Sequence, residues 1–184
     1  MRKILTILKN FTLLEKGLLL CFLLPPAGIG LLILIGLHTL YQEWWTKRRF
    51  YYSLSSYFFL CLFLSTVGAV IFEREITFLV ISVMILGYWG LYIRILDCEK
   101  NKLFHKFRLI MIFGGIYSCI IGWISKVVTF PVVLSYLTGT ILFGQVEPKN
   151  FNRLIGCAYN PNFTVFILLT AIAFLFAIIL SSLK

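Results

Sequence analysis

The amino-acid sequence predicts an all-α polytopic membrane protein, a helix bundle that forms a single integral membrane domain over residues 1–184. Of these residues 60% are hydrophobic and only 13% are charged, whereas a soluble domain carries about a quarter charged residues. The apolar residues also gather in runs long enough to cross a bilayer, which takes about 20 residues per helix. These observations exclude a disordered chain, a collagen-like fibre and a water-soluble enzyme domain.

The first apolar stretch, residues 17–41, is divided by Pro25 and Pro26. Neither proline donates a helical hydrogen bond, and each disfavours helical backbone in the residue before it. The stretch is therefore either one kinked helix or a hairpin of two short helices, over residues 13–24 and 27–41, which turns between them.

The distribution of Lys and Arg favours the hairpin. Its topology places thirteen of the 17 basic residues on one side of the membrane and four on the other, whereas a single kinked helix divides them nine to eight. Because cytoplasmic loops carry the excess of basic residues, both termini are predicted to be cytoplasmic, with about six helical membrane elements between them. The net charge of +10 is then explained by topology, and no nucleic-acid partner is expected.

Four further stretches have the length and the apolar character of membrane helices, and they cover residues 52–72, 76–96, 107–127 and 163–183. Before the first of them, Trp44 and Trp45 precede Lys47, Arg48 and Arg49. This order is typical of an aromatic belt followed by a basic anchor at the inner membrane interface.

Two features of the second half of the chain concern packing. The apolar segment 130–143 is interrupted by a proline and a glycine, which predicts a short re-entrant or interfacial helix. Gly114, Ser118 and Gly122 recur every fourth residue and line one side of a helix with small side chains. Such a stripe predicts close packing against another helix or against a partner membrane protein.

Residues suited to catalysis or metal binding are sparse. The acidic residues fall at the ends of predicted helices or in loops, so the sequence predicts no proton path through the membrane. His38 and His105 lie near the predicted inner face, without a second histidine or a carboxylate at the spacing of metal ligands. The spacing of residues therefore predicts no metal and no cofactor, and it identifies no catalytic residue.

The segment before the last predicted helix carries the candidate site, which consists of Arg153, Gly156, Tyr159, Asn160 and Asn162. The N-terminus of a helix favours anions because its first N–H groups are unpaired and its dipole is positive there. Arg153 adds a planar cation with five donors, and Gly156 permits a tight turn or a close approach to a ligand. These residues predict a phosphate or diphosphate site at the outer leaflet.

The alternative interpretation of the same residues is a well-capped helix with a basic residue beside the lipid headgroups. Asn160 caps the helix if Pro161 is its first residue, and Asn162 caps it otherwise. Spacing alone does not separate the capped helix from the anion site.

The pattern Arg153-x-x-Gly156-x-x-x-Asn160-Pro161-Asn162 at the start of an apolar helix resembles the bacterial O-antigen ligase and polymerase family. The Leu-Pro-Pro-Ala-Gly turn between the two opening helices is similar as well. The resemblance implies a multi-pass protein of the bacterial inner membrane that acts in cell-surface polysaccharide synthesis. It implies transfer of a glycan from an undecaprenyl diphosphate carrier at the outer face, without a nucleotide sugar or a metal, with Arg153 facing the diphosphate.

The resemblance extends to the N-terminal half of such proteins only. Family members have further helices and a large outer loop with another arginine and a histidine, for which His38 and His105 do not substitute. We therefore expect the chain to contact membrane lipids and to bind the lipid diphosphate. We do not expect the chain by itself to transfer glycan. The alternative function is that of a non-catalytic accessory or immunity-type membrane subunit, which docks on its partner through Gly114, Ser118 and Gly122.

Overall fold

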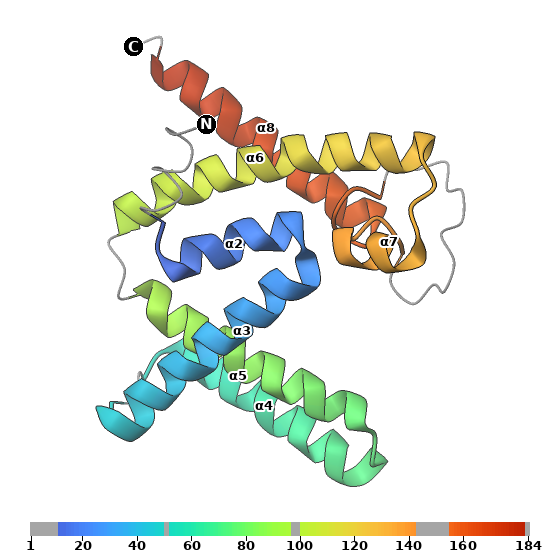
Figure 1. Ribbon diagram of the computed structural model, residues 1–184. Helices are drawn as coiled ribbons and strands as arrows, with labels where there is room; N and C mark the ends of the chain where they lie inside the picture. The colour runs from blue at the N-terminus through green and yellow to red at the C-terminus, as the bar shows by residue number, and fades with distance from the viewer. Residues whose placement is uncertain (1–10, 50–51, 97–99, 143–154, 183–184) are drawn as a thin grey trace. The chain divides into compact units, whose positions relative to one another are not determined.

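The computed structural model of the chain describes residues 11–49, 52–96, 100–142 and 155–182 (Figure 1). Every regular element in these ranges is a helix, which confirms the predicted all-α class. The elements are α2 (Leu13–Leu23), α3 (Pro25–Tyr41), the π-helix η1 (Gln42–Thr46), α4 (Leu54–Glu73), α5 (Ile76–Leu96), α6 (Lys100–Val127), α7 (Val132–Thr138) and α8 (Pro161–Ser182).

Four helices are long and apolar enough to cross a membrane, and they comprise Leu54–Glu73, Ile76–Leu96, Phe104–Val127 and Pro161–Ser181. The prediction of a helical membrane protein is confirmed at this level. The opening helices α2 and α3 have 11 and 17 residues, fewer than the roughly 20 that a crossing takes. The count of six membrane elements and the cytoplasmic position of the termini stay predictions.

The opening stretch consists of two helices that meet at Leu24, whose φ of −140° and ψ of 80° interrupt the helical backbone. The second helix was expected to begin at residue 27, after a turn that includes both prolines, but α3 already begins at Pro25. The reason is that the first turn of a helix has no intrahelical use for its N–H groups, so proline fits there without losing a hydrogen bond. At the other end of α2, Thr12 and Glu15 form a capping box.

The chain divides into two compact units, and each is described by itself. Unit 1 consists of Met1–Ile29 and Asn101–Lys184, and its core is built around Phe22, Ile110 and Cys157. Helix α6 packs against α2 and α8 through adjacent glycines, since Gly114 lies against the ring of Phe22 and Gly115 against Ala171. The buried carboxylate of Glu15 also forms a salt bridge of 3.0 Å with Lys106 of α6.

Unit 2 consists of Gly30–Lys100, with Leu40, Trp89 and Ile93 in its core. Helices α4 and α5 lie side by side (Figure 1), joined at Arg74 in a left-handed conformation. The Ser82 hydroxyl of α5 donates to Thr66 Oγ1 of α4 at 2.8 Å. Hydrogen bonds of this kind link membrane helices, because a hydroxyl group inside the membrane has no water as an alternative partner.

Helix α3 crosses α5 at glycines in unit 2. A Cβ atom built on Gly36 would lie 1.8 Å from the carbonyl oxygen of Gly87, and one built on Gly90 would lie 1.8 Å from that of Gly36. The two backbones are therefore in direct contact, as small residues permit in membrane proteins. The sequence analysis identified the stripe on α6 and missed this second glycine contact.

We expect Gly36→Ala to lower the free energy of unfolding by about 1–3 kcal/mol, because the new methyl group has to separate α3 from the α5 backbone. The measurement is chemical or thermal unfolding of the purified chain in detergent, followed by circular dichroism. Gly30→Ala in the same helix is the matched control, since nothing lies within 4 Å of its Cβ position. Equal stability of the two variants would contradict the close crossing.

Candidate functional site

The candidate site lies where a loop, residues 155–160, enters α8. Two hydrogen bonds fix the start of this loop in unit 1. The Cys157 N–H donates to Ser118 Oγ of α6 at 3.2 Å, and the Thr164 hydroxyl of α8 donates to the Ile155 carbonyl oxygen. Both hydroxyl residues are almost fully buried, with exposed fractions of 0% for Ser118 and 1% for Thr164. The loop is therefore held by α6 on one side and by α8 on the other.

Gly156 occupies the tightest point of the loop. Its φ is +66°, in the left-handed region that favours glycine. A Cβ atom there would lie 2.3 Å from Ser118 Oγ and 2.8 Å from Thr164 Cγ2. The sequence suggested that Gly156 permits either a tight turn or a close approach to a ligand. In the structure Gly156 forms the tight turn, and the groups that approach it closely are the side chains of Ser118 and Thr164.

Tyr159 fastens the loop to the end of α7. Its N–H donates to the Gly139 carbonyl oxygen at 2.9 Å, and its hydroxyl donates to the Tyr136 carbonyl oxygen at 2.5 Å. Gly139 ends α7 in a left-handed conformation with a φ of +73°. Burial raises the pKa of the Tyr159 phenol, so the hydroxyl stays protonated and keeps its donor at neutral pH.

Asn160 is the cap of α8, which decides between the two caps that the sequence left open. Its Oδ1 accepts from the Asn162 N–H at 2.9 Å, and its carbonyl oxygen accepts from the Thr164 N–H at 3.1 Å. Pro161 is the first helical residue and has no N–H. The helix therefore begins with fewer unpaired backbone donors than the anion-site interpretation assumed, because its own cap uses the Asn162 N–H.

Four of the five predicted site residues thus lie in one loop–helix junction, but with different contacts. Gly156 and Tyr159 face the chain's own helices, whereas Asn160 and Asn162 form the start of α8. Arg153 lies outside the described residues. The described residues resume two positions after it, at Ile155.

The hydroxyl residues that hold the junction were not predicted from the sequence. Ser118 was interpreted as one of three small residues of a packing stripe, and Thr164 was given no role. All three stripe residues are buried in unit 1. Gly114 lies against the ring of Phe22, and Ser118 accepts a hydrogen bond from the Cys157 N–H of the loop. The available indication was a serine between two glycines in the apolar part of a predicted membrane helix, which suggests an irregular backbone nearby.

Neutral hydrogen-bonding groups line the described part of the junction. They are the hydroxyls of Ser118, Thr164 and Tyr159, the amide of Asn160 and the thiol of Cys157. Burial raises the pKa of the Cys157 thiol, which keeps it in the protonated, unreactive form. This set of groups is suited to positioning a chain or a ligand and not to attacking one.

Comparisons of the chain with known protein families, with curated proteins and with solved structures find no match. The chemistry of the junction therefore has to be argued from its own residues.

We expect Gly156→Ala to lower the free energy of unfolding by roughly 2–4 kcal/mol, because it combines a left-handed backbone with a methyl group placed against Ser118 Oγ. In a Ser118→Ala background part of this loss disappears, since the atom at 2.3 Å is gone. Unfolding in detergent measures all four proteins of the cycle. Gly68→Ala, with open space at its Cβ position, is the control. Strict additivity would show that the two residues do not meet.

Proposed function

We propose that this chain is a multi-pass protein of the bacterial inner membrane that acts in cell-surface polysaccharide synthesis, as O-antigen ligases and polymerases do. In this proposal the junction before α8 holds the diphosphate of an undecaprenyl-linked glycan at the outer face. The observation that supports it is the fixed loop, which joins α6, α7 and α8 through Ser118, Tyr159 and Thr164. Binding sites are effective when the surrounding structure holds them in place before the ligand arrives.

The charge of a diphosphate requires positive potential and hydrogen-bond donors. The dipole of α8 provides a partial positive charge at Asn160, irrespective of how the backbone donors are used. The cap uses only Oδ1 of the Asn160 amide, whose nitrogen carries two further donors. Arg153 provides the full positive charge of the proposed site.

The chain length restricts where Arg153 can lie. Arg153 stands three positions before Gly156 in the sequence, and a fully extended chain advances at most about 3.3–3.6 Å per residue. The proposal therefore needs the connecting chain to reach no further than about 11 Å from Gly156, whose position is fixed by its contacts. A guanidinium near the departing diphosphate would stabilise the negative charge that develops there when the glycan is transferred.

A second candidate function is that of a non-catalytic accessory or immunity-type subunit. The neutral, protonated groups of the junction favour it, because they are suited to holding a ligand or a loop and not to moving protons. Docking through the α6 stripe is less well supported, since Gly114 and Ser118 are covered by segments of the same chain. The carrier-binding proposal and the subunit proposal differ in whether Arg153 and Asn160 affect binding of the carrier lipid.

We expect Arg153→Ala to weaken the binding of undecaprenyl diphosphate about tenfold or more, the typical value of a lost charge-assisted hydrogen bond. Arg153→Lys keeps the charge and should lose less. Binding to the purified full chain in nanodiscs is the measurement.

Asn160→Asp gives a second, independent variant for the same binding measurement. An aspartate caps a helix as well as an asparagine does, so stability should be unchanged, but its negative charge should repel the diphosphate. Asn160→Ser keeps a neutral cap and serves as the control. If Arg153→Ala and Asn160→Asp both bind as the wild type does, the junction is a capped helix and the subunit function is favoured.

The proposal also requires that the start of α8 faces outwards. A cysteine introduced at exposed Asn162, in a chain whose own five cysteines are replaced by alanine, should react with a membrane-impermeant maleimide added to intact spheroplasts. A cysteine at Lys47, on the predicted inner side, should react only after lysis. The reverse pattern would overturn the predicted orientation and with it the proposed site.

A further inference from the structure

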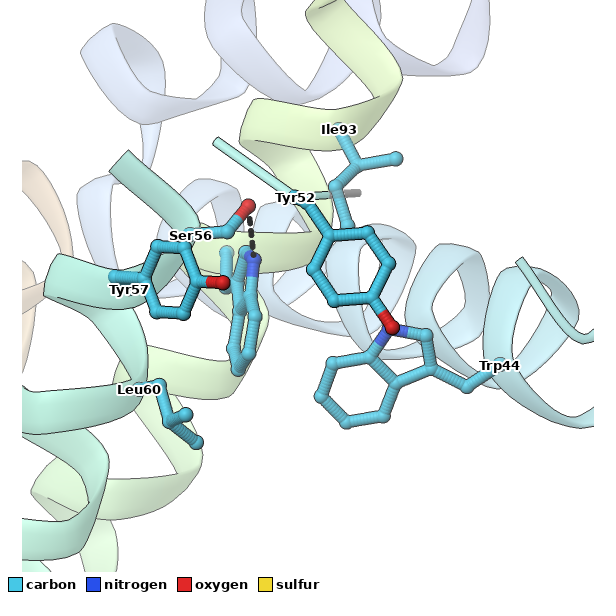
Figure 2. A pocket seen from close by; sticks show the side chains of 7 residues that line it. Trp44, Tyr52, Ser56, Tyr57, Leu60 and Ile93 are labelled. Carbon is cyan, nitrogen blue, oxygen red and sulfur yellow. Dashed lines mark hydrogen bonds between the residues drawn. The ribbon is translucent and has the colours of Figure 1, made fainter. Parts of the chain in front are cut away.

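Unit 2 contains a cavity of about 100 Å³ with aromatic walls, separate from the junction before α8 (Figure 2). Its aromatic residues are Trp44 of η1, Tyr52 just before α4, Tyr57 in the first turn of α4, and Trp89 of α5. Figure 2 shows Tyr57 beside Ser56, with Tyr52 and Trp44 on the other side of the drawn hydrogen bond. Four rings from three segments of the chain therefore line one small, partly open space.

Two contacts hold the walls in place. The indole Nε1–H of Trp89 donates to Ser56 Oγ at 3.3 Å, which fixes the ring and engages its only polar edge. Trp44 packs edge-to-face against Trp89, with ring centroids 4.8 Å apart and planes at 79°. Edge-to-face packing of this kind fixes the two indoles relative to each other at the wall of the cavity.

The cavity lies at the ends of two helices that are long and apolar enough to span a membrane. Tyr57 is in the first turn of α4, and Ile93, another wall residue, is in the last turn of α5. Ends of spans lie at the depth of lipid headgroups, where tryptophan and tyrosine are enriched. A ligand of this cavity is therefore a headgroup or a small solute and not the interior of an acyl chain.

The charge of the walls favours a cation. Aromatic faces carry negative quadrupole potential and attract ammonium groups, and aromatic cages recognise quaternary ammonium ligands in this way. One residue before Trp44, Glu43 is 3% exposed; its Oε1 pairs with Lys47, and its buried Oε2 has no hydrogen-bond partner. A cavity of 150 Å³ holds benzene, so about 100 Å³ suits a small branched cation and is too small for a sugar ring.

We propose that this aromatic cavity binds a quaternary ammonium group of the choline type, carried either by a phospholipid headgroup or by a free solute. Arg48 and Arg49 follow Trp44 by four and five residues and are exposed, and their positive charge would attract the phosphate that accompanies such a headgroup. The inference does not depend on the carrier-binding function, because its residues belong to unit 2 and those of the junction to unit 1.

Choline titrated into the purified full chain in a maltoside detergent should change the tryptophan fluorescence and saturate. Tyr57→Leu removes one aromatic face and should weaken binding about three- to tenfold. Tyr57→Phe keeps the face and should bind nearly as the wild type does. Tyr57 is 55% exposed, so both variants are expected to fold, and their thermal unfolding checks this. Unchanged binding by Tyr57→Leu would overturn the proposal.

A second ligand separates charge from shape. In the carbon isostere of choline a tert-butyl group replaces the trimethylammonium group, so the size is kept and the charge is lost. We expect this compound to bind at least tenfold more weakly than choline. Equal binding of the two compounds would show an ordinary apolar cavity and would overturn the ammonium site.

The source of the cation is tested in nanodiscs of phosphatidylglycerol with and without phosphatidylcholine. If the phosphatidylcholine headgroup occupies the cavity, free choline should bind more weakly in the nanodiscs that contain this lipid, and Tyr57→Leu should remove the difference. If the lipid has no effect, the ligand is a free solute. Both results support an ammonium site, and they assign its source.

Discussion

The backbone of a chain this apolar has to satisfy its polar groups internally wherever it is not helical, because lipid offers no replacement for water. In unit 1 this constraint falls on the loop between α7 and α8. Ser118, Thr164 and the Tyr159 hydroxyl supply the partners that the backbone needs at Cys157, Ile155 and Tyr136. The geometry of the candidate site is a consequence of that requirement, since the hydroxyl groups that complete the backbone also determine how the chain enters α8.

Composition and charge predicted the helical membrane class, because the four apolar helices depend on length and hydrophobicity, which are local properties. The break at Leu24 and the cap at Asn160 were also within reach, since proline and asparagine act on the backbone beside them. Contacts between distant segments were not. Nothing in the spacing of Gly36 indicates that it meets Gly87 and Gly90, about fifty residues away.

The same limit explains what was missed at each site. Gly156 was identified, but its neighbour Ser118 is separated from it in the sequence by the last turns of α6 and by α7, so its role emerges only when the chain folds back. Trp44 was assigned to an interfacial belt from its residue type, whereas its pairing with Trp89 depends on tertiary structure. Sequence patterns thus identify polar and aromatic residues that could form a site. The residues that orient them are identified only from the tertiary structure.

The π-helix η1 has a consequence for the tolerance of the chain to deletion. Its backbone closes one turn over five residues, as the hydrogen bond of 2.9 Å from the Lys47 N–H to the Gln42 carbonyl oxygen shows. Such a turn contains one residue more than an α-helical turn, and that residue rotates the following side chains by about 100°. A shortening of η1 by one residue would turn the Trp44 indole away from α5, although the composition would hardly change. The number of residues in this turn, as much as their identity, sets the direction of the aromatic wall.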